Sequence, residues 1–199
     1  PGGAGKTTVM CALLNLGPAD CRLVAATPAA VRAAIPGGPR RCYVCHEIGA
    51  GPYFGYLWGA PLQAYCALAG DGHILAANLH ADTVEEARHQ VCVENRVPPE
   101  RFNAFHYAIF LRMRGGYGNV RRWIDKVYVA DGRAGHALLY SSGGGFDPAA
   151  PAGPWSEPEW VAQCRACLET AYASGVRSIE ETRVAAVRFL QSRDMESGG

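Results

Sequence analysis

Long hydrophobic runs are missing from this sequence. Its most apolar stretches are short and carry His, Arg or Glu, so no transmembrane helix is predicted. The first residues show neither the charged segment nor the apolar core of a signal peptide, and no internal repeat or low-complexity tract is present. These absences favour a globular chain in the cytoplasm.

An excess of charge of one sign is missing as well. The 19 Lys and Arg nearly balance the 18 Asp and Glu, which leaves a net charge of +1. The basic residues are spread out apart from one local group, Arg112, Arg114, Arg121, Arg122 and Lys126. This distribution does not indicate binding to nucleic acid or to an anionic membrane. With 199 residues and 49% hydrophobic content, the chain can bury one good core, so one principal domain is expected.

The eight cysteines include two pairs with the spacing of zinc ligands, Cys42 with Cys45 and Cys164 with Cys167. Cys42 and Cys45 lie in a strand-like run, where residues three apart point to opposite faces and cannot chelate one ion. Cys164 and Cys167 share a helix face, but no second pair is near them in the sequence. We therefore interpret the cysteines as free thiols in a reducing compartment and predict no zinc site.

The first eight residues carry the end of a phosphate-binding loop. They read PGGAGKTT, the last part of G-x-x-x-x-G-K-[ST], whose first glycine would fall one residue before Pro1. Such glycines let backbone N–H groups surround an anion, Lys6 can reach the β- and γ-phosphates, and the Thr7 hydroxyl can hold Mg²⁺ at the start of a helix. The alternative is a glycine-rich turn that happens to precede a lysine. The predicted nucleotide-binding residues are Gly2, Gly3, Ala4, Gly5, Lys6, Thr7 and Thr8.

The pattern after this loop alternates between helices and strands. Expected helices cover residues 7–16, 29–35, 60–69 and 83–95, and expected strands cover residues 22–26, 41–47 and 74–79. This alternation predicts an α/β fold with a parallel sheet and helices on both faces. Between the second strand and the third helix, residues 49–59 are expected to form a loop, in which the aromatic stretch 53–58 either contacts another molecule or packs on the core.

From residue 105 the pattern changes to antiparallel hairpins. Strands are expected at residues 107–112, 123–130 and 137–140, as edge strands around a turn at residues 115–118. A Gly-, Pro- and Ser-rich linker follows, and then two helices, the second opened by the S-x-x-E capping box of Ser178 and Glu181. The expected organisation is a core over residues 1–140, a linker over 141–158 and a helical pair over 159–193.

Three chemically active residues are expected at one edge of the parallel sheet. Thr7 ends the loop, while Glu47 and His80 each follow a buried strand, and carboxyl ends of parallel strands face ligands. Phosphoryl transfer needs a charge that neutralises the phosphates, a metal, and a group that orients the attacking water; Lys6, Thr7 and Glu47 supply these. The alternatives are an ordinary strand-end acid for Glu47 and a core histidine for His80.

Two further motifs resemble one family. Residues 45–49, CHEIG, resemble a G-E-[IM]-R-D box, and residues 72–82, GHILAANLHAD, are similar to a T-G-H-x-x-x-x-T-x-H-[AT]-[ND] histidine box. These boxes belong to the secretion-superfamily ATPases, the hexameric motors of type II and type IV secretion, type IV pili and archaeal flagella. The helix that follows and the basic hairpin at residues 108–129 also resemble this family, so the resemblance covers about residues 1–140.

The resemblance implies a RecA-like P-loop fold that binds ATP with Mg²⁺ and hydrolyses it. It implies that Lys6 and Thr7 hold phosphates and Mg²⁺, that Glu47 activates or orients water, that His80 senses the γ-phosphate, and that His73 supports the strand. A homo-oligomer, a hexamer in the family, is implied as well. So are an inner-membrane platform protein as partner and a cytoplasmic location peripheral to that membrane.

The sequence also departs from the family pattern. The strand at residues 22–26 does not end in the family's acidic box, and Gly49 and Ala50 replace the Arg and Asp that follow the family Glu. The source of the family's arginine fingers is left open. Two alternatives therefore stay open: another P-loop class, such as a DNA translocase or nucleotide kinase, and a degenerate module that binds nucleotide as an assembly or regulatory signal. A GTPase would need an N-K-x-D motif, which is missing.

Overall fold

The computed structural model describes residues 3–116, 118–132, 135–147, 149–150 and 158–197; Gly2 of the predicted loop lies outside them. The chain divides into two compact units. One is made of Pro1–Thr7 and Arg22–Gly153, and the other of Thr8–Cys21 and Pro154–Gly199. Residues 8–21 thus group with the C-terminal helices, whereas the sequence placed them in the core over residues 1–140.

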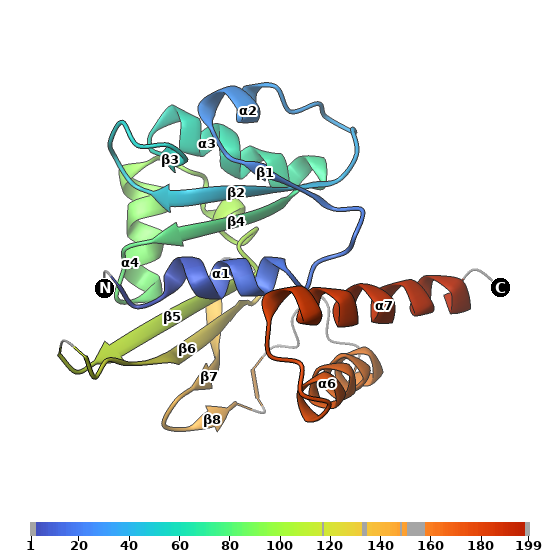
Figure 1. Ribbon diagram of the computed structural model, residues 1–199. Helices are drawn as coiled ribbons and strands as arrows, with labels where there is room; N and C mark the ends of the chain where they lie inside the picture. The colour runs from blue at the N-terminus through green and yellow to red at the C-terminus, as the bar shows by residue number, and fades with distance from the viewer. Residues whose placement is uncertain (1–2, 117, 133–134, 148, 151–157, 198–199) are drawn as a thin grey trace. The chain divides into compact units, whose positions relative to one another are not determined.

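The first unit contains a parallel sheet centred on β2, in agreement with the α/β prediction (Figure 1). β4 pairs along one edge of β2, and β1 and then β3 pair along the other edge. β3 falls inside the predicted loop over residues 49–59, because Gly55 takes a left-handed conformation (φ +74°) and turns the chain back onto β2. The strands of this sheet are β1 (Arg22–Ala25), β2 (Arg41–Ile48), β3 (Tyr56–Leu57) and β4 (Ile74–Leu79).

Short helices follow the strands of this sheet. Thr83 caps α4, since its hydroxyl oxygen accepts from the backbone N–H of Glu86 at 3.1 Å. The predicted helix over residues 83–95 is not uniform, however: it continues beyond Arg88 as a π-helix, which the buried Asn95 side chain closes by donating to the Gln90 carbonyl oxygen at 2.7 Å. The helices are α2 (Pro28–Arg32), α3 (Ala60–Ala67) with a 3₁₀ turn (Leu68–Asp71), α4 (Val84–Arg88), the π-helix (His89–Glu94) and α5 (Pro99–Phe102).

A second, antiparallel sheet completes this unit, with strand order β5-β6-β7-β8. The hairpins were predicted, but their prediction as edge strands is wrong, since they form a sheet of their own. Ala108, Phe110 and Tyr128 pack their side chains against the core of the parallel sheet, and the hairpin backbone does not pair with that sheet. β8 lies inside the predicted linker over residues 141–158, of which residues 148 and 151–157 are outside the described ranges. The strands are β5 (Tyr107–Arg114), β6 (Arg121–Ala130), β7 (His136–Ser141) and β8 (Gly145–Phe146).

The second unit is helical and contains the predicted C-terminal pair. α6 (Pro158–Ala173) and α7 (Ile179–Ser197) contact each other through Trp160 and Phe189, whose rings stack with centroids 5.5 Å apart. The capping box is confirmed, since Ser178 Oγ accepts from the Glu181 N–H at 3.2 Å and Glu181 Oε2 accepts from the Ser178 N–H at 3.2 Å. Two apolar residues of α7, Ile179 and Val184, are exposed. Within the described ranges, no helix combines the length and apolar character needed to cross a bilayer.

Candidate functional site

The glycine loop leads directly into α1 (Lys6–Leu14). Gly3 and Gly5 have φ values of +75° and +92°, in the left-handed region where a side chain would be strained, and Ala4 between them is buried. Glycine is therefore required by the backbone at both positions of the loop. Of the predicted residues in α1, Lys6 and Thr7 belong to the first compact unit, while Thr8 is exposed and belongs to the second.

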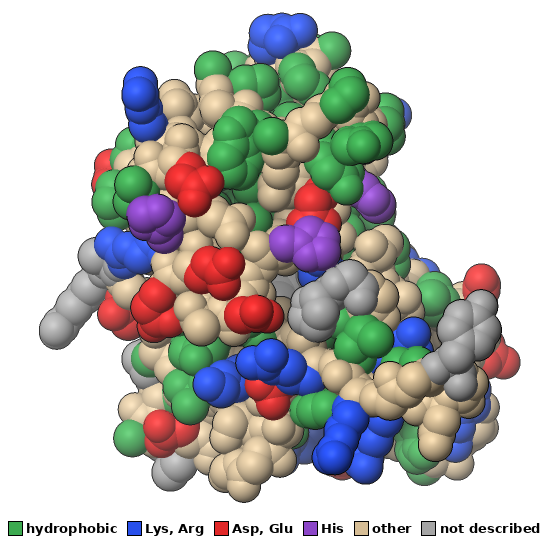
Figure 2. All heavy atoms as spheres, turned by 90° about the vertical axis from the view of Figure 1, so that its left-hand side faces the viewer, with side chains coloured by type: hydrophobic (Ala, Val, Ile, Leu, Met, Phe, Trp, Pro, Cys, Tyr) green, Lys and Arg blue, Asp and Glu red, His purple; other side chains and the backbone are tan. Residues whose placement is uncertain are grey.

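Three predicted site residues meet around one point. Lys6 Nζ donates to His80 Nε2 at 3.0 Å and lies 3.8 Å from Glu47 Oε2, and His80 Nε2 lies 3.7 Å from the same oxygen. A cation, a carboxylate and an imidazole from three distant segments are thus in mutual contact. Figure 2 views the face toward which the arrowheads of β2 and β4 point in Figure 1, and histidine and acidic side chains gather there above a group of basic ones.

The strands bring Glu47 and His80 together in two ways. Glu47 lies near the end of β2 and His80 follows the end of β4, so both occupy the carboxyl edge of the parallel sheet. The register between these strands also shifts: Cys45 pairs with Ala77 and Ile48 with Leu79, so two residues of β2, His46 and Glu47, face one residue of β4. Bulges of this kind re-aim side chains next to functional sites.

Asn78 is the residue of β4 that faces the bulge. It is 6% exposed, and its side-chain nitrogen donates to the His46 carbonyl oxygen at 3.0 Å and to Thr7 Oγ1 at 3.4 Å. Asn78 therefore connects the bulge of β2 with the hydroxyl predicted to hold Mg²⁺. The sequence analysis missed this residue, although its position two before His80 places both on one face of the strand.

Glu47 has one carboxylate oxygen without a partner. Its side chain is only 9% exposed; Oε2 lies near Lys6 and His80, but the buried Oε1 has no hydrogen bond to any described residue. A buried acceptor left unpaired costs about 1 to 3 kcal/mol, so such an oxygen normally has a water or an ion beside it. This oxygen and the loop beside it fit a ligand that brings Mg²⁺ or a water molecule to the carboxylate.

The backbone at and after His80 is held by α4 and the π-helix. Gln90 Nε2 donates to the His80 carbonyl oxygen at 2.8 Å, and Glu86 Oε2 accepts from the Asp82 N–H at 2.7 Å. The Asp82 side chain lies 3.9 Å from the Arg112 guanidinium of β5, so an ion pair connects the segment after His80 with the second sheet. π-Helical turns occur frequently at functional sites.

His73 lies at the opposite end of β4 from His80. It is 7% exposed, its Nδ1 accepts from the Arg41 N–H at 3.3 Å, and its ring packs edge-on against Tyr43 with centroids 5.2 Å apart. These contacts hold the starts of β2 and β4 together. The structure thus brings His80 to the loop and keeps His73 away from it.

In the described part of the chain, no cluster of three or more His, Cys, Asp or Glu side chains could hold a metal ion by itself. Burial raises the pKa of the Cys45 and Cys66 thiols to about 12, so they stay protonated and are poor metal ligands. Mg²⁺ in nucleotide sites needs no such cluster, because it takes one or two protein oxygens together with phosphates and water. Thr7 Oγ1 and the Glu47 carboxylate fit that pattern.

Comparisons with known proteins do not assign these residues to a family. No protein-family model matches the chain, and no curated protein matches it significantly. The resemblance to secretion ATPases therefore rests on the motifs of the sequence, and the activity that it implies is a proposal.

Proposed function

We propose that this chain binds ATP with Mg²⁺ at the site made by Lys6, Thr7, Glu47 and His80, and that it hydrolyses the nucleotide as a motor subunit of the secretion or pilus type. The observation that carries the proposal is the contact of Lys6, Glu47 and His80 beside a loop with two left-handed glycines. A lone ion pair would not need that loop, and a glycine turn would not need the buried carboxylate.

Each side chain has one part in the proposed reaction. Lys6 neutralises phosphate charge and the Thr7 hydroxyl is a ligand of Mg²⁺, which when bound neutralises the charge that develops on the phosphates. The Glu47 carboxylate orients the attacking water and accepts its proton, since Oε1 is buried and free of partners among the described residues. His80 contacts the Lys6 ammonium and so responds when phosphate replaces that contact.

The cellular role is the part of the proposal that rests on the resemblance alone. It includes assembly into a homo-oligomer, contact with an inner-membrane platform protein, and a location in the cytoplasm at that membrane. Pilus assembly or export of macromolecules is the work such a motor would drive.

MgATP titration and phosphate release from the 199-residue chain test this function. Lys6→Ala should abolish binding and leave the fold intact, because the lysine lies at the loop and not in the core. Glu47→Gln should keep binding but slow hydrolysis at least about 100-fold, the scale of losing a general base. Glu85→Gln, an exposed acid in the first turn of α4, is the matched control and should change neither. Equal MgATP affinity of Lys6→Ala and wild type would refute the site.

A second candidate is a module that binds nucleotide without turnover. The observation in its favour is that the end of β1 carries no acidic side chain, whereas the family has an acidic box there. Ala26 is fully buried at this position, and the Thr27 hydroxyl caps α2 by accepting from the Ala30 N–H. MgATP binding that Lys6→Ala abolishes, combined with no phosphate release from the wild type, would establish this candidate.

A further inference from the structure

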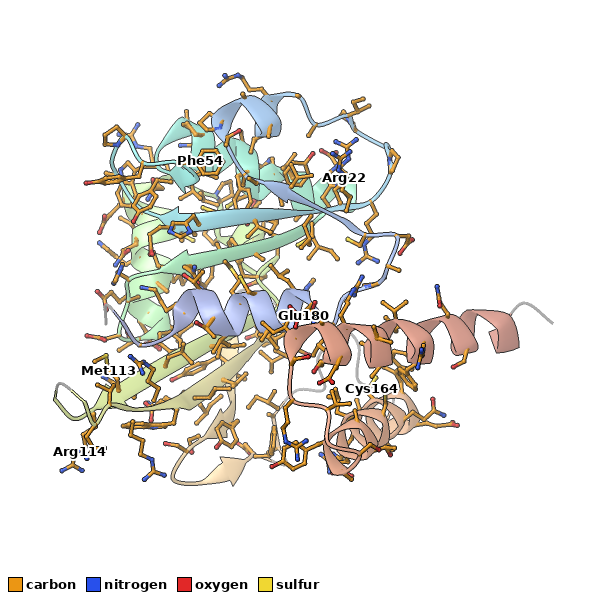
Figure 3. The ribbon with its side chains drawn as sticks, viewed as in Figure 1. Arg22, Phe54, Met113, Arg114, Cys164 and Glu180 are labelled. Carbon is orange, nitrogen blue, oxygen red and sulfur yellow. The ribbon has the colours of Figure 1, made fainter. Side chains whose placement is uncertain are left out.

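The end of the β5–β6 hairpin lies against the glycine loop. Arg122 Nε donates to the Gly3 carbonyl oxygen at 2.8 Å, and Arg122 Cδ lies 3.7 Å from where a Cβ on Gly5 would stand. Met113, the partner of Arg122 across the ladder, lies 3.9 Å from the corresponding position on Gly3. In Figure 3, Met113 and Arg114 project from opposite sides of β5, so one face of the hairpin meets the loop.

The charge of Arg122 has no counter-ion among the described residues. Its one hydrogen bond there goes to a neutral carbonyl oxygen, so most of the five donors of the guanidinium are left for another acceptor. Arg112, the residue before Met113, differs in this respect, since it pairs with both Asp82 and Asp125. The two arginines thus differ in their surroundings.

Arg114 and Arg121 stand directly opposite each other in the ladder, next to the pair of Met113 and Arg122 but on the other face of the hairpin. Arg122 is therefore the arginine of β6 that faces the loop, and Arg121 is not. The buried, unpartnered Oε1 of Glu47 independently indicates that the same site takes a ligand.

We propose that Arg122 binds phosphate oxygens of the nucleotide, so that the second sheet supplies a cation to the loop of its own chain. The planar guanidinium matches phosphate geometry with two parallel hydrogen bonds, which an ammonium cannot make. The inference rests on the proposed nucleotide site and adds a ligand that the loop motif does not contain. The class of ligand is a nucleoside polyphosphate, recognised here through its phosphates and not through its base.

The test compares Arg122→Gln with Arg121→Gln, a neighbouring arginine of the same strand on the opposite face. MgATP and inorganic tripolyphosphate with Mg²⁺ are titrated into the full chain. Arg122→Gln should weaken both about 10- to 100-fold, the loss expected for a charge-assisted hydrogen-bond pair, whereas Arg121→Gln should stay within about threefold. Loss of affinity for tripolyphosphate separates phosphate binding from contacts with the base.

The outcomes keep this inference apart from the proposed function. If the wild type binds neither MgATP nor tripolyphosphate, both the nucleotide site and the role of Arg122 are refuted. If the wild type binds them, Lys6→Ala does not bind them, and Arg122→Gln binds them as tightly as the wild type, only the role of Arg122 is overturned. If Arg122→Gln does not fold, NMR of the wild type tests the proposal. The Arg122 Nε–H signal, assigned by its loss in Arg122→Lys, should shift when the protein is saturated with tripolyphosphate. An unchanged signal would overturn the proposal.

Discussion

Replacing Asn78 should destabilise the parallel sheet at the candidate site. Asn78→Ala removes the donor of the His46 carbonyl oxygen inside the bulge of β2, where the bond measures 3.0 Å and Asn78 is 6% exposed. A buried acceptor left without its donor costs about 1 to 3 kcal/mol. The second contact, to Thr7 Oγ1, is 3.4 Å long and adds little. We therefore expect a loss of about 2 kcal/mol in the free energy of unfolding.

A loss of about 2 kcal/mol should lower Tm by about 4 to 8 °C in a chain of this length. Asn78→Asp should be more damaging than Asn78→Ala, because a carboxylate oxygen would replace the amide nitrogen against the His46 carbonyl oxygen and beside the Glu47 carboxylate. Asn119→Ala, an exposed asparagine before β6, is the control and should stay within about 0.5 kcal/mol of the wild type.

Urea denaturation and thermal unfolding, both followed by circular dichroism, measure the three variants side by side. The reasoning is refuted if Asn78→Asp is as stable as the wild type, since the amide nitrogen would then not be the atom that faces His46. It is refuted equally if Asn78→Ala and Asn119→Ala have the same free energy of unfolding.

Two further predictions concern histidines and the cap of α7. His80→Ala should slow phosphate release from MgATP, because His80 contacts the lysine that takes the phosphates, and it should leave Tm unchanged, because its side chain is 58% exposed. His73→Ala should lower Tm and keep the rate; phosphate release paired with thermal unfolding checks both, and the reverse pattern would place the nucleotide at the wrong end of β4. Ser178→Ala should destabilise the helical unit by about 1 kcal/mol. Hydrogen bonds from the Arg177 and Ser178 N–H groups lower the pKa of Glu181, so its contribution is present above the unfolded-state pKa and is lost as pH falls through the folded-state value. Urea denaturation below pH 4.5 should thus show a smaller acid loss in Ser178→Ala than in the wild type, and equal losses would contradict the cap.

Features that depend on nearby residues could be predicted from the sequence. The bounds of β4 were predicted to the residue, and the capping box at Ser178 was recognised because its hydroxyl bonds a backbone N–H three residues further on. The approach of Glu47 to His80 was also predictable, since parallel strands must end at one edge of their sheet.

Features that depend on distant residues could not be predicted in this way. The partners of Asn78 lie 32 and 71 residues away, so nothing local to β4 reveals that its amide fills a bulge in β2. The π-helix has the same origin: Asn95 accepts from the Gly59 N–H at 2.6 Å, 36 residues earlier, and this contact fixes where the helix ends. The second sheet is separate from the first because its side chains pack on the core of the first. The alternation of residues along a strand does not predict which sheet that strand joins.

The contact between Lys6 and Glu47 suggests how nucleotide binding and hydrolysis are linked in the proposed function. Two unit charges 3.8 Å apart attract each other by about 4 kcal/mol at an effective dielectric constant of about 20. Phosphates that bind Lys6 compete with this attraction and release the carboxylate, which is then free to orient water or a metal-bound ligand. Glu47→Gln removes the competitor, so its MgATP affinity should equal or exceed that of the wild type even while hydrolysis slows. A weaker affinity in Glu47→Gln would mean instead that the carboxylate is needed to hold Mg²⁺.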